Sequence, residues 1–518
     1  MTSARPPETL RAASPGGTTL ANNDSPPSNS AASSDQVLNP HRTVSSSAVN
    51  DWMLSHPVFA TKARGIRLRV MRFTASWFSV TMGTGIVNTL LFHLPFESPH
   101  VAFRAVGAVF LVFDMILFAA FSLLTVARYV LYPRIFWAMI KHETHSLFLG
   151  CIPMGFVTII SGIASTGDAY GLNTLDTALV LYWISTAMSI LTAFGVPYIM
   201  FTHHSNRAET MTAAWLLPIV PLITQAAVGS TLCKLLLQTS PPRTSYCLTL
   251  MIASYLQGGI GTLLAAAIIV MYLQRLILHH LPPREVIVSS WLPVGPIGQY
   301  GFASIELGRV AVELFPLISS PDVKPELQIL GPAMYGTAVV TGLLLWGLGI
   351  WFAFLAVVSI ATQLSNARRN PGEGMLAVFN MGWWAFTFPL GSLTLLTFSL
   401  AETFDSMFFK VCSAIFTFSV LTLWIVVFFP TAIGFFRGTL FAAPCLQSLP
   451  KEYVEKMRGE SRPPSRGRSR VREGEAKKEG LERPGEGARE EREVEGTGAV
   501  MEREAQDVIR RERGEIMD

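Results

Sequence analysis

The stretch WLPVGPIGQYGF, residues Trp291–Phe302, decides the fold, because it puts two prolines near the middle of an apolar segment. Proline lacks a backbone N–H and clashes with the preceding helical turn, so Pro293 and Pro296 free carbonyl groups that lipid cannot satisfy. Such a backbone is tolerated in a bilayer only where it is buried in protein or lines a water-filled cavity. The stretch therefore predicts a broken membrane helix beside a pore.

The same kind of break recurs in every second apolar stretch of the chain. Ten such stretches follow one another, and the odd-numbered ones are interrupted near their middles. The interrupting residues are Gly83 and Gly85 in the first, Pro153 in the third, Pro218 and Pro221 in the fifth, Pro293 and Pro296 in the seventh, and Pro389 in the ninth. This alternation predicts repeated helical hairpins, each with one kinked helix, and a pore lined by the kinked helices.

Composition supports a membrane protein independently of the prolines. The chain has 518 residues, of which 50% are apolar and 15% charged, whereas a soluble domain carries roughly 25% charge. We expect an all-α polytopic membrane protein with ten transmembrane helices. The expected spans are 73–94, 103–127, 146–165, 177–200, 212–236, 247–276, 287–312, 331–360, 375–400 and 408–436.

The basic residues orient these spans, because cytoplasmic loops carry an excess of Lys and Arg. The excess lies before the first span and after the even-numbered spans, at Lys62, Arg64, Arg67, Arg69, Arg72, Arg128, Arg134, Lys141, Arg207, Arg275, Arg284, Arg368 and Arg369. Both termini should therefore be cytoplasmic. Residues 1–70 and 438–518 are polar or highly charged, and we expect them to be disordered tails around a membrane domain at 71–437.

Polar residues inside the expected spans have both functional and structural interpretations. Asp114 falls near the centre of the second span, where it is either a proton relay or a hydrogen-bonded packing residue. Glu306, Arg309 and Glu313 share one face of the seventh span. Arg309 either attracts an anion or belongs to a neutralised network.

Catalytic and metal-binding motifs are not evident in the sequence. Histidine pairs such as His142 and His145 lie at the ends of spans, and HETH is not the zinc motif HExxH. A membrane redox enzyme would need deep paired histidines or a cysteine site. We expect a protein that is not an enzyme, without a metal, a cofactor or a nucleic-acid partner.

An aromatic run precedes the break in the ninth stretch. Trp383, Trp384, Phe386 and Phe388 come directly before Pro389. Such a run is usually a lipid or helix contact, but beside a kink it can also plug a pore.

Three segments together resemble a known family. They are SWFSVTMGTGIV (Ser76–Val87), WLPVGPIGQYGF (Trp291–Phe302) and FNMGWWAFTFPLGSLTL (Phe379–Leu395), and they resemble the tellurite-resistance/dicarboxylate transporter family, most of all its fungal sulfite efflux branch. The resemblance covers about residues 70–437. It implies five hairpins in quasi-fivefold symmetry, a homotrimer, and a plugging ring at Phe388, or at Phe386 if the register differs.

The expected function is sulfite or hydrogensulfite efflux across the plasma membrane. Kinked helices would expose half-helix amino ends whose unpaired amides favour an anion without trapping it. A malate or dicarboxylate permease remains the alternative, although it should carry more basic groups than Arg309 alone.

Overall fold

The computed structural model describes residues 65–94, 100–318, 325–369 and 379–449. Every regular element in these ranges is helical, which confirms the all-α polytopic fold. All the described residues belong to the first of two compact units, Met1–Gly459, and the second unit, Glu460–Asp518, lies outside them.

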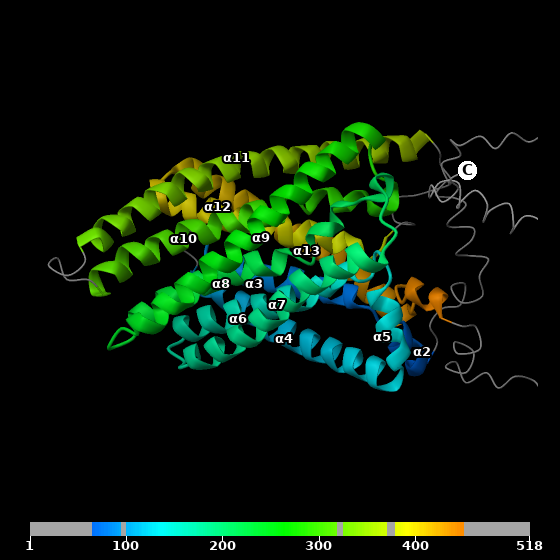
Figure 1. Ribbon diagram of the computed structural model, residues 1–518, viewed down its shortest axis with the longest axis horizontal. Coiled ribbons are helices and arrows are strands. Elements are labelled where there is room, and N and C mark those ends of the chain that lie inside the picture. The colour runs from blue at the N-terminus through cyan, green and yellow to red at the C-terminus, as the bar shows by residue number, and fades with distance from the viewer. Residues whose placement is uncertain (1–64, 95–99, 319–324, 370–378, 450–518) are drawn as a thin grey trace, which may run out of the picture. The chain divides into compact units, whose positions relative to one another are not determined.

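Each expected span overlaps a helix of the described chain. One set, here called the inner helices, comprises α3 (Phe78–Phe92), α6 (Cys151–Ala169), α8 (Val220–Gln238), α10 (Val294–Ile318) and α12 (Thr387–Phe404). The outer helices are α4 (His100–Leu131), α7 (Leu175–His203), α9 (Thr244–His279), α11 (Pro325–Arg369) and α13 (Met407–Arg437). Figure 1 shows these helices running alongside one another.

Eight helices of the described chain are long and apolar enough to cross a membrane. This makes the protein a multi-pass membrane protein. The inner helices α3 and α10 are not among the eight, and α3 has only 15 residues. The count of ten crossings and the quasi-fivefold symmetry stay predictions.

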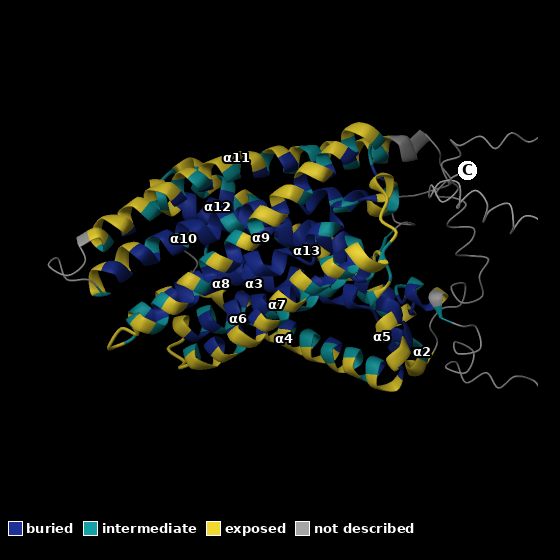
Figure 2. Ribbon diagram, in the orientation of Figure 1, coloured by how far each residue is buried: buried dark blue, intermediate teal, exposed yellow. Residues whose placement is uncertain are grey.

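The inner helices contact one another in a closed cycle. α3 packs on α6, α6 on α8, α8 on α10, α10 on α12, and α12 again on α3, while each inner helix also packs on the outer helix that follows it. Figure 2 shows buried residues on the inner helices and exposed ones along α4 and α11. Large apolar side chains such as Leu123, Leu191 and Phe354 are exposed on outer helices, as expected for surfaces that contact lipid.

A short 3₁₀ segment precedes each inner helix. These segments are η1 (Ala75–Trp77), η2 (Leu147–Gly150), η4 (Ala213–Leu216), η5 (Arg284–Trp291) and η7 (Met381–Phe386). The prolines lie at or just after the change from 3₁₀ to α geometry, as Pro221 and Pro389 do. Proline is tolerated in a first helical turn because its missing N–H has no partner there. The breaks therefore lie at the starts of α-helices, whereas the sequence indicated kinks near their middles.

The first inner helix differs from the expected pattern, because α3 is continuous through Gly83 and Gly85. Both glycines serve close packing. A β-carbon on Gly85 would lie 2.8 Å from Oδ2 of Asp114, and one on Gly83 would lie 2.6 Å from Cε3 of Trp384. The interruption in this stretch is η1, which precedes both glycines.

Shorter elements lie before, between and after the long helices. They are α2 (Ile66–Arg72), α5 (Pro133–Ile140), η3 (Ala208–Thr210) and η8 (Pro444–Ser448). The buried Arg128 ties α2 to the segment after α13, since it donates to the carbonyl of Met71 at 3.1 Å and contacts Sγ of Cys445 at 3.6 Å. Packed residues thus continue past the expected limits of 71 and 437, and the rest of the two tails lies outside the described residues.

Candidate functional site

A small cavity lies where the inner helices meet. Its volume is about 20 Å³, enough for roughly one water molecule. All five inner helices contribute to its wall, which consists of Ile86, Thr89, His93, Val157, Thr158, Ser161, Thr224, Ala227, Val228, Thr231, Gln299, Phe302, Phe388 and Leu395. The cavity is therefore a junction of the whole inner ring and does not belong to one hairpin.

The wall mixes apolar side chains with hydroxyl groups, one amide and the histidine His93. Among the described residues, no lysine, arginine, aspartate or glutamate lines the cavity. The site thus lacks the fixed charges that bind an ion tightly, and weak binding is what conduction requires.

Three threonines of the wall already donate their protons to their own helices. The hydroxyl of Thr158 donates to the carbonyl of Gly155 at 2.8 Å, that of Thr224 to Pro221 at 2.8 Å, and that of Thr89 to Gly85 at 3.2 Å. A hydroxyl has one proton. These groups can therefore offer only their oxygen lone pairs to the cavity.

Backbone amides next to two of the breaks are also paired, contrary to the sequence-based expectation. In the fifth stretch the amide of Leu222 donates to the carbonyl of Ile219 at 3.1 Å, and in the seventh the amide of Gly295 donates to Leu292 at 3.0 Å. The 3₁₀ turns use carbonyls three residues back. At these amides the breaks leave no N–H free for an anion.

The expected plugging ring reaches the cavity wall. Phe388 is the second residue of α12, is 3% exposed and lines the cavity. Phe386 instead packs near Trp291 and Trp383, with ring centroids 6.1 and 5.9 Å away. Of the two rings, Phe388 is therefore the one that lines the cavity, and its role as a plug stays a prediction.

The other residues expected to line the pore do not reach the cavity. Its wall contains none of Gly83, Gly85, Pro153, Pro218, Pro221, Pro293, Pro296 and Pro389. These residues lie at helix starts or helix contacts. They therefore affect the cavity indirectly, by positioning the helices that form its wall.

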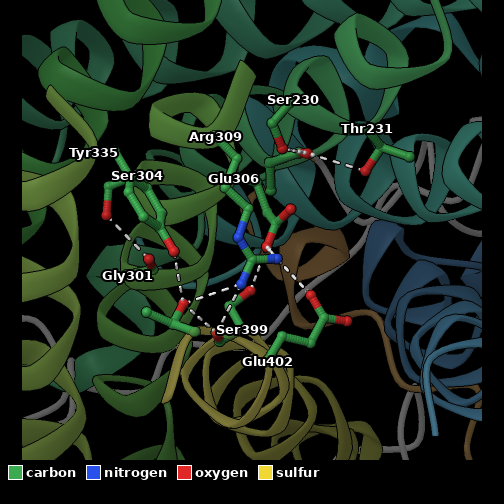
Figure 3. A network of polar contacts seen from close by, with 11 residues as sticks. Ser230, Thr231, Gly301, Ser304, Glu306, Arg309, Tyr335, Ser399 and Glu402 are labelled. Carbon is green, nitrogen blue, oxygen red and sulfur yellow. Dashed lines mark hydrogen bonds and ion pairs between the residues drawn. The ribbon is translucent and has the colours of Figure 1, made fainter. Parts of the chain in front are cut away.

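Arg309 is paired with carboxylates (Figure 3). It does not line the cavity. Its guanidinium is 3.0 Å from Oε1 of Glu306 and also forms an ion pair with Glu402. It further donates to the carbonyl of Ser399 and to Oγ1 of Thr403, both at 3.0 Å. Two carboxylates and one guanidinium leave an excess of negative charge, which disfavours an approaching anion.

This network differs in one member from the one that the sequence indicated. Glu402 of α12 takes the place expected for Glu313, which is exposed and has no ion pair among the described residues. The spacing of Glu306, Arg309 and Glu313 identifies neighbours on one helix only. The network in fact joins α10 to α12.

Asp114 is fully buried on α4, and neither of its carboxylate oxygens has a hydrogen-bond partner within the described chain. Its side chain packs against Gly85 of α3. Thr158, which lines the cavity, packs against the same glycine. Asp114 does not line the cavity. Its expected role as a proton relay remains a prediction.

Gln299 and His93 also line the cavity, and the sequence reading assigned them no role. Gln299 belongs to the seventh apolar stretch. A single amide side chain among apolar residues was the sequence feature that could have identified it as a site residue. Within the described ranges, no three His, Cys, Asp or Glu side chains come together as a metal site.

These features define a polytopic helical membrane protein with a neutral cavity at the centre of its inner helices. A family model described as "Voltage-dependent anion channel" matches residues 72–432. The chain belongs to this family, which confirms the family resemblance seen in its sequence, and it is an anion transporter.

The similar proteins include fungal transporters. A sulfite efflux pump of Arthroderma benhamiae is 36% identical over 362 residues, which cover 70% of this chain and 90% of that protein. A sulfite efflux pump of Trichophyton rubrum is 37% identical with the same coverage. A malic acid transport protein of Schizosaccharomyces pombe is 24% identical over 70% of this chain and 78% of that protein.

Proposed function

We propose that this protein exports sulfite or hydrogensulfite through the cavity between its inner helices. A cavity wall contributed by all five inner helices, without Lys, Arg, Asp or Glu among the described residues, is the observation that carries this proposal. The greater similarity to sulfite efflux pumps than to a malic acid transport protein supports the choice of substrate. We place the protein in the plasma membrane with both termini in the cytoplasm.

A neutral polar cavity suits a small oxyanion better than a dicarboxylate. Malate carries two separated charges, and a site for it should offer a cation or several free donors to each carboxylate. Arg309 is bound to Glu306 and Glu402 and lies away from the cavity. We therefore keep the dicarboxylate permease only as the second candidate. The named relatives are transporters, which supports transport over a redox enzyme as the function.

Phe388 acts as the gate in this proposal. The cavity of about 20 Å³ has room for roughly one water molecule, so an oxyanion with its hydration shell does not fit in the described conformation. The Phe388 ring fills part of the inner space, and an apolar ring can close a narrow pore by excluding volume and water. Conduction then requires the ring to move away from the cavity.

The family resemblance adds an assembly to the proposal. We expect a homotrimer in which each protomer has its own pore. All five inner helices of one chain contribute to the cavity wall, and we expect each protomer to form its own site. Transport should therefore not depend on a residue supplied by a neighbour.

Sulfite efflux from lipid vesicles tests the proposed function directly. Purified protein is reconstituted into vesicles loaded with sulfite, and external sulfite is followed over time with protein-free vesicles as the control. We expect release only with the protein. Release of malate but not of sulfite would establish the permease instead.

A further inference from the structure

Gln299 lines the cavity and carries a buried polar atom without a hydrogen-bond partner among the described residues. Its side chain is 4% exposed and forms part of the cavity wall. The Oε1 atom has no hydrogen-bond partner, and no hydrogen bond of the amide nitrogen is found within the described ranges either. A buried amide without partners is costly, so a water molecule or a ligand in the cavity should satisfy it.

Three threonines of the wall are poorer donors to an anion than an amide is, although the hydroxyl of Ser161 also lines the cavity. Thr89, Thr158 and Thr224 have given their protons to backbone carbonyls. The Nδ1 atom of His93 lies 2.7 Å from the carbonyl of Thr89. An amide offers two N–H donors and one carbonyl acceptor, and Gln299 has both ends available.

Tight helix packing fixes the backbone beside Gln299. A β-carbon on the preceding Gly298 would lie 2.5 Å from the nitrogen of Leu393 on α12. The same pair of helices carries Phe388, which lines the same cavity. The amide is thus held on a rigid element next to the ring proposed as the gate, as a recognition group should be.

We propose that the Gln299 amide is the anion-recognition group of the pathway and that it selects hydrogensulfite. The amide N–H groups donate to the charged oxygens, and the carbonyl Oε1 accepts the proton that hydrogensulfite carries. The threonine oxygens add further acceptors to the wall, which favours a protonated anion over a fully deprotonated one. This inference rests on the proposed sulfite efflux.

A single neutral amide also accounts for release. A hydrogen bond to a charged partner is stronger than one between neutral groups, yet the amide lacks the net charge that would trap the ion. Chloride can accept from the N–H groups but has no proton for Oε1. The site should therefore distinguish hydrogensulfite from chloride.

The test compares two Gln299 variants with a matched control. Gln299→Leu removes both ends of the amide at similar size, and Gln299→Glu replaces the donor end by an oxygen. The control is Gln225→Leu on α8, since Gln225 is buried and lies outside the cavity wall, with its amide nitrogen 3.2 Å from the carbonyl of Tyr182. Sulfite and chloride release from vesicles are measured for each protein, as is the rise in unfolding temperature on adding sulfite.

We expect Gln299→Leu to lower the ratio of sulfite to chloride release about tenfold, the loss of one hydrogen bond to a charged group. Gln299→Glu should lower it further, and both variants should lose the stabilisation by sulfite that Gln225→Leu retains. Wild-type release should also rise as acidification converts sulfite to hydrogensulfite. Folded Gln299 variants with the wild-type ratio, or failure of both to fold, would overturn the role of Gln299 while sulfite efflux stood. Absence of sulfite release by the wild-type protein would instead refute the proposed function, and this inference with it.

Discussion

Gly298 of α10 faces the backbone of Leu393 on α12 so closely that a β-carbon on Gly298 would lie 2.5 Å from the Leu393 nitrogen. The two helices therefore meet backbone to backbone. Small residues permit such an approach between membrane helices, where lipid removes most of the hydrophobic drive for association. The contact joins the two helices that carry Gln299 and Phe388, the residues to which we assign recognition and gating.

The first prediction follows from this contact. Gly298→Ala should separate α10 from α12 and destabilise the protein by about 1–3 kcal/mol, as overpacking of a tight core does. Sulfite release per folded molecule should fall as well, because the cavity walls shift. Thermal unfolding and vesicle flux measure the two effects. Gly336→Ala on α11 is the control, since nothing lies within 4 Å of its β-carbon position, and an equal effect there would contradict the explanation.

The gate gives a second prediction. Phe388→Ala should yield a well-expressed protein that releases sulfite faster and with less selectivity, because the ring removed lines a cavity. Phe398→Ala is the matched change on the same helix, since Phe398 is also 3% exposed but lies outside the cavity wall. It should cost roughly 3–5 kcal/mol of stability, as a buried ring does, without faster release. Poor folding of Phe388→Ala, or unaltered flux in a folded protein, would make Phe388 a packing residue.

Arg309 provides a third prediction, which separates a structural role from anion attraction. Arg309→Met leaves Glu306 without its cation in a mostly buried position, so stability should fall by about 2 kcal/mol. Sulfite release per folded molecule should stay close to wild type. The double variant with Glu306→Gln should recover part of the stability. A stable Arg309→Met protein with slow release would instead make Arg309 an anion-attracting residue.

The sequence predicted the helices well because their signals are local. Apolar length located a helix in every expected span, and the central prolines marked four of the five inner helices, whereas α3 is continuous through Gly83 and Gly85. The 3₁₀ segments were missed, since proline indicates an interrupted helix but not the geometry on its amino side. The sequence also could not show which face of α12 points toward the cavity, because every residue from Thr387 to Ala401 is buried.

The site was less accessible to prediction than the fold. Phe388 was found through an aromatic run and a family resemblance. Glu402 was missed as a partner of Arg309 because the two are 93 residues apart in the chain, and spacing along one helix cannot reveal such a contact. Gln299 was missed because a helix buried on all sides has no periodic pattern to tell which side chain faces a cavity.

A fourth prediction concerns stability at low pH. His145 lies in the turn before η2, and burial, followed by the charges of His142 and Arg128, lowers its pKa from 6.5 to about 3. Below pH 6.5 the unfolded chain binds a proton that the folded protein does not, so stability falls as the pH decreases, by at most about 1.4 kcal/mol per pH unit. Unfolding temperatures between pH 7.5 and 5 should show a steeper decline for wild type than for His145→Gln. If the unfolding temperatures of both proteins fall equally with pH, His145 is not the origin of the loss of stability.

The last prediction addresses Asp114. An ionised carboxylate without a partner is very costly in an apolar interior, and both oxygens of Asp114 are buried without a hydrogen-bond partner among the described residues. We therefore expect the carboxyl to be neutral. Asp114→Asn has nearly the same shape as the neutral acid, so this variant should fold and release sulfite like wild type.

Sulfite release from vesicles with an imposed pH gradient measures the role of Asp114 in coupling. For a packing residue, wild type and Asp114→Asn should respond equally to the gradient. Asp114→Leu is the control for packing, because its branched side chain should crowd the contact with Gly85 and lower stability by about 1–3 kcal/mol. If Asp114→Asn folds and conducts but no longer responds to the gradient, the carboxyl transfers protons during transport, and the proton-relay role is established.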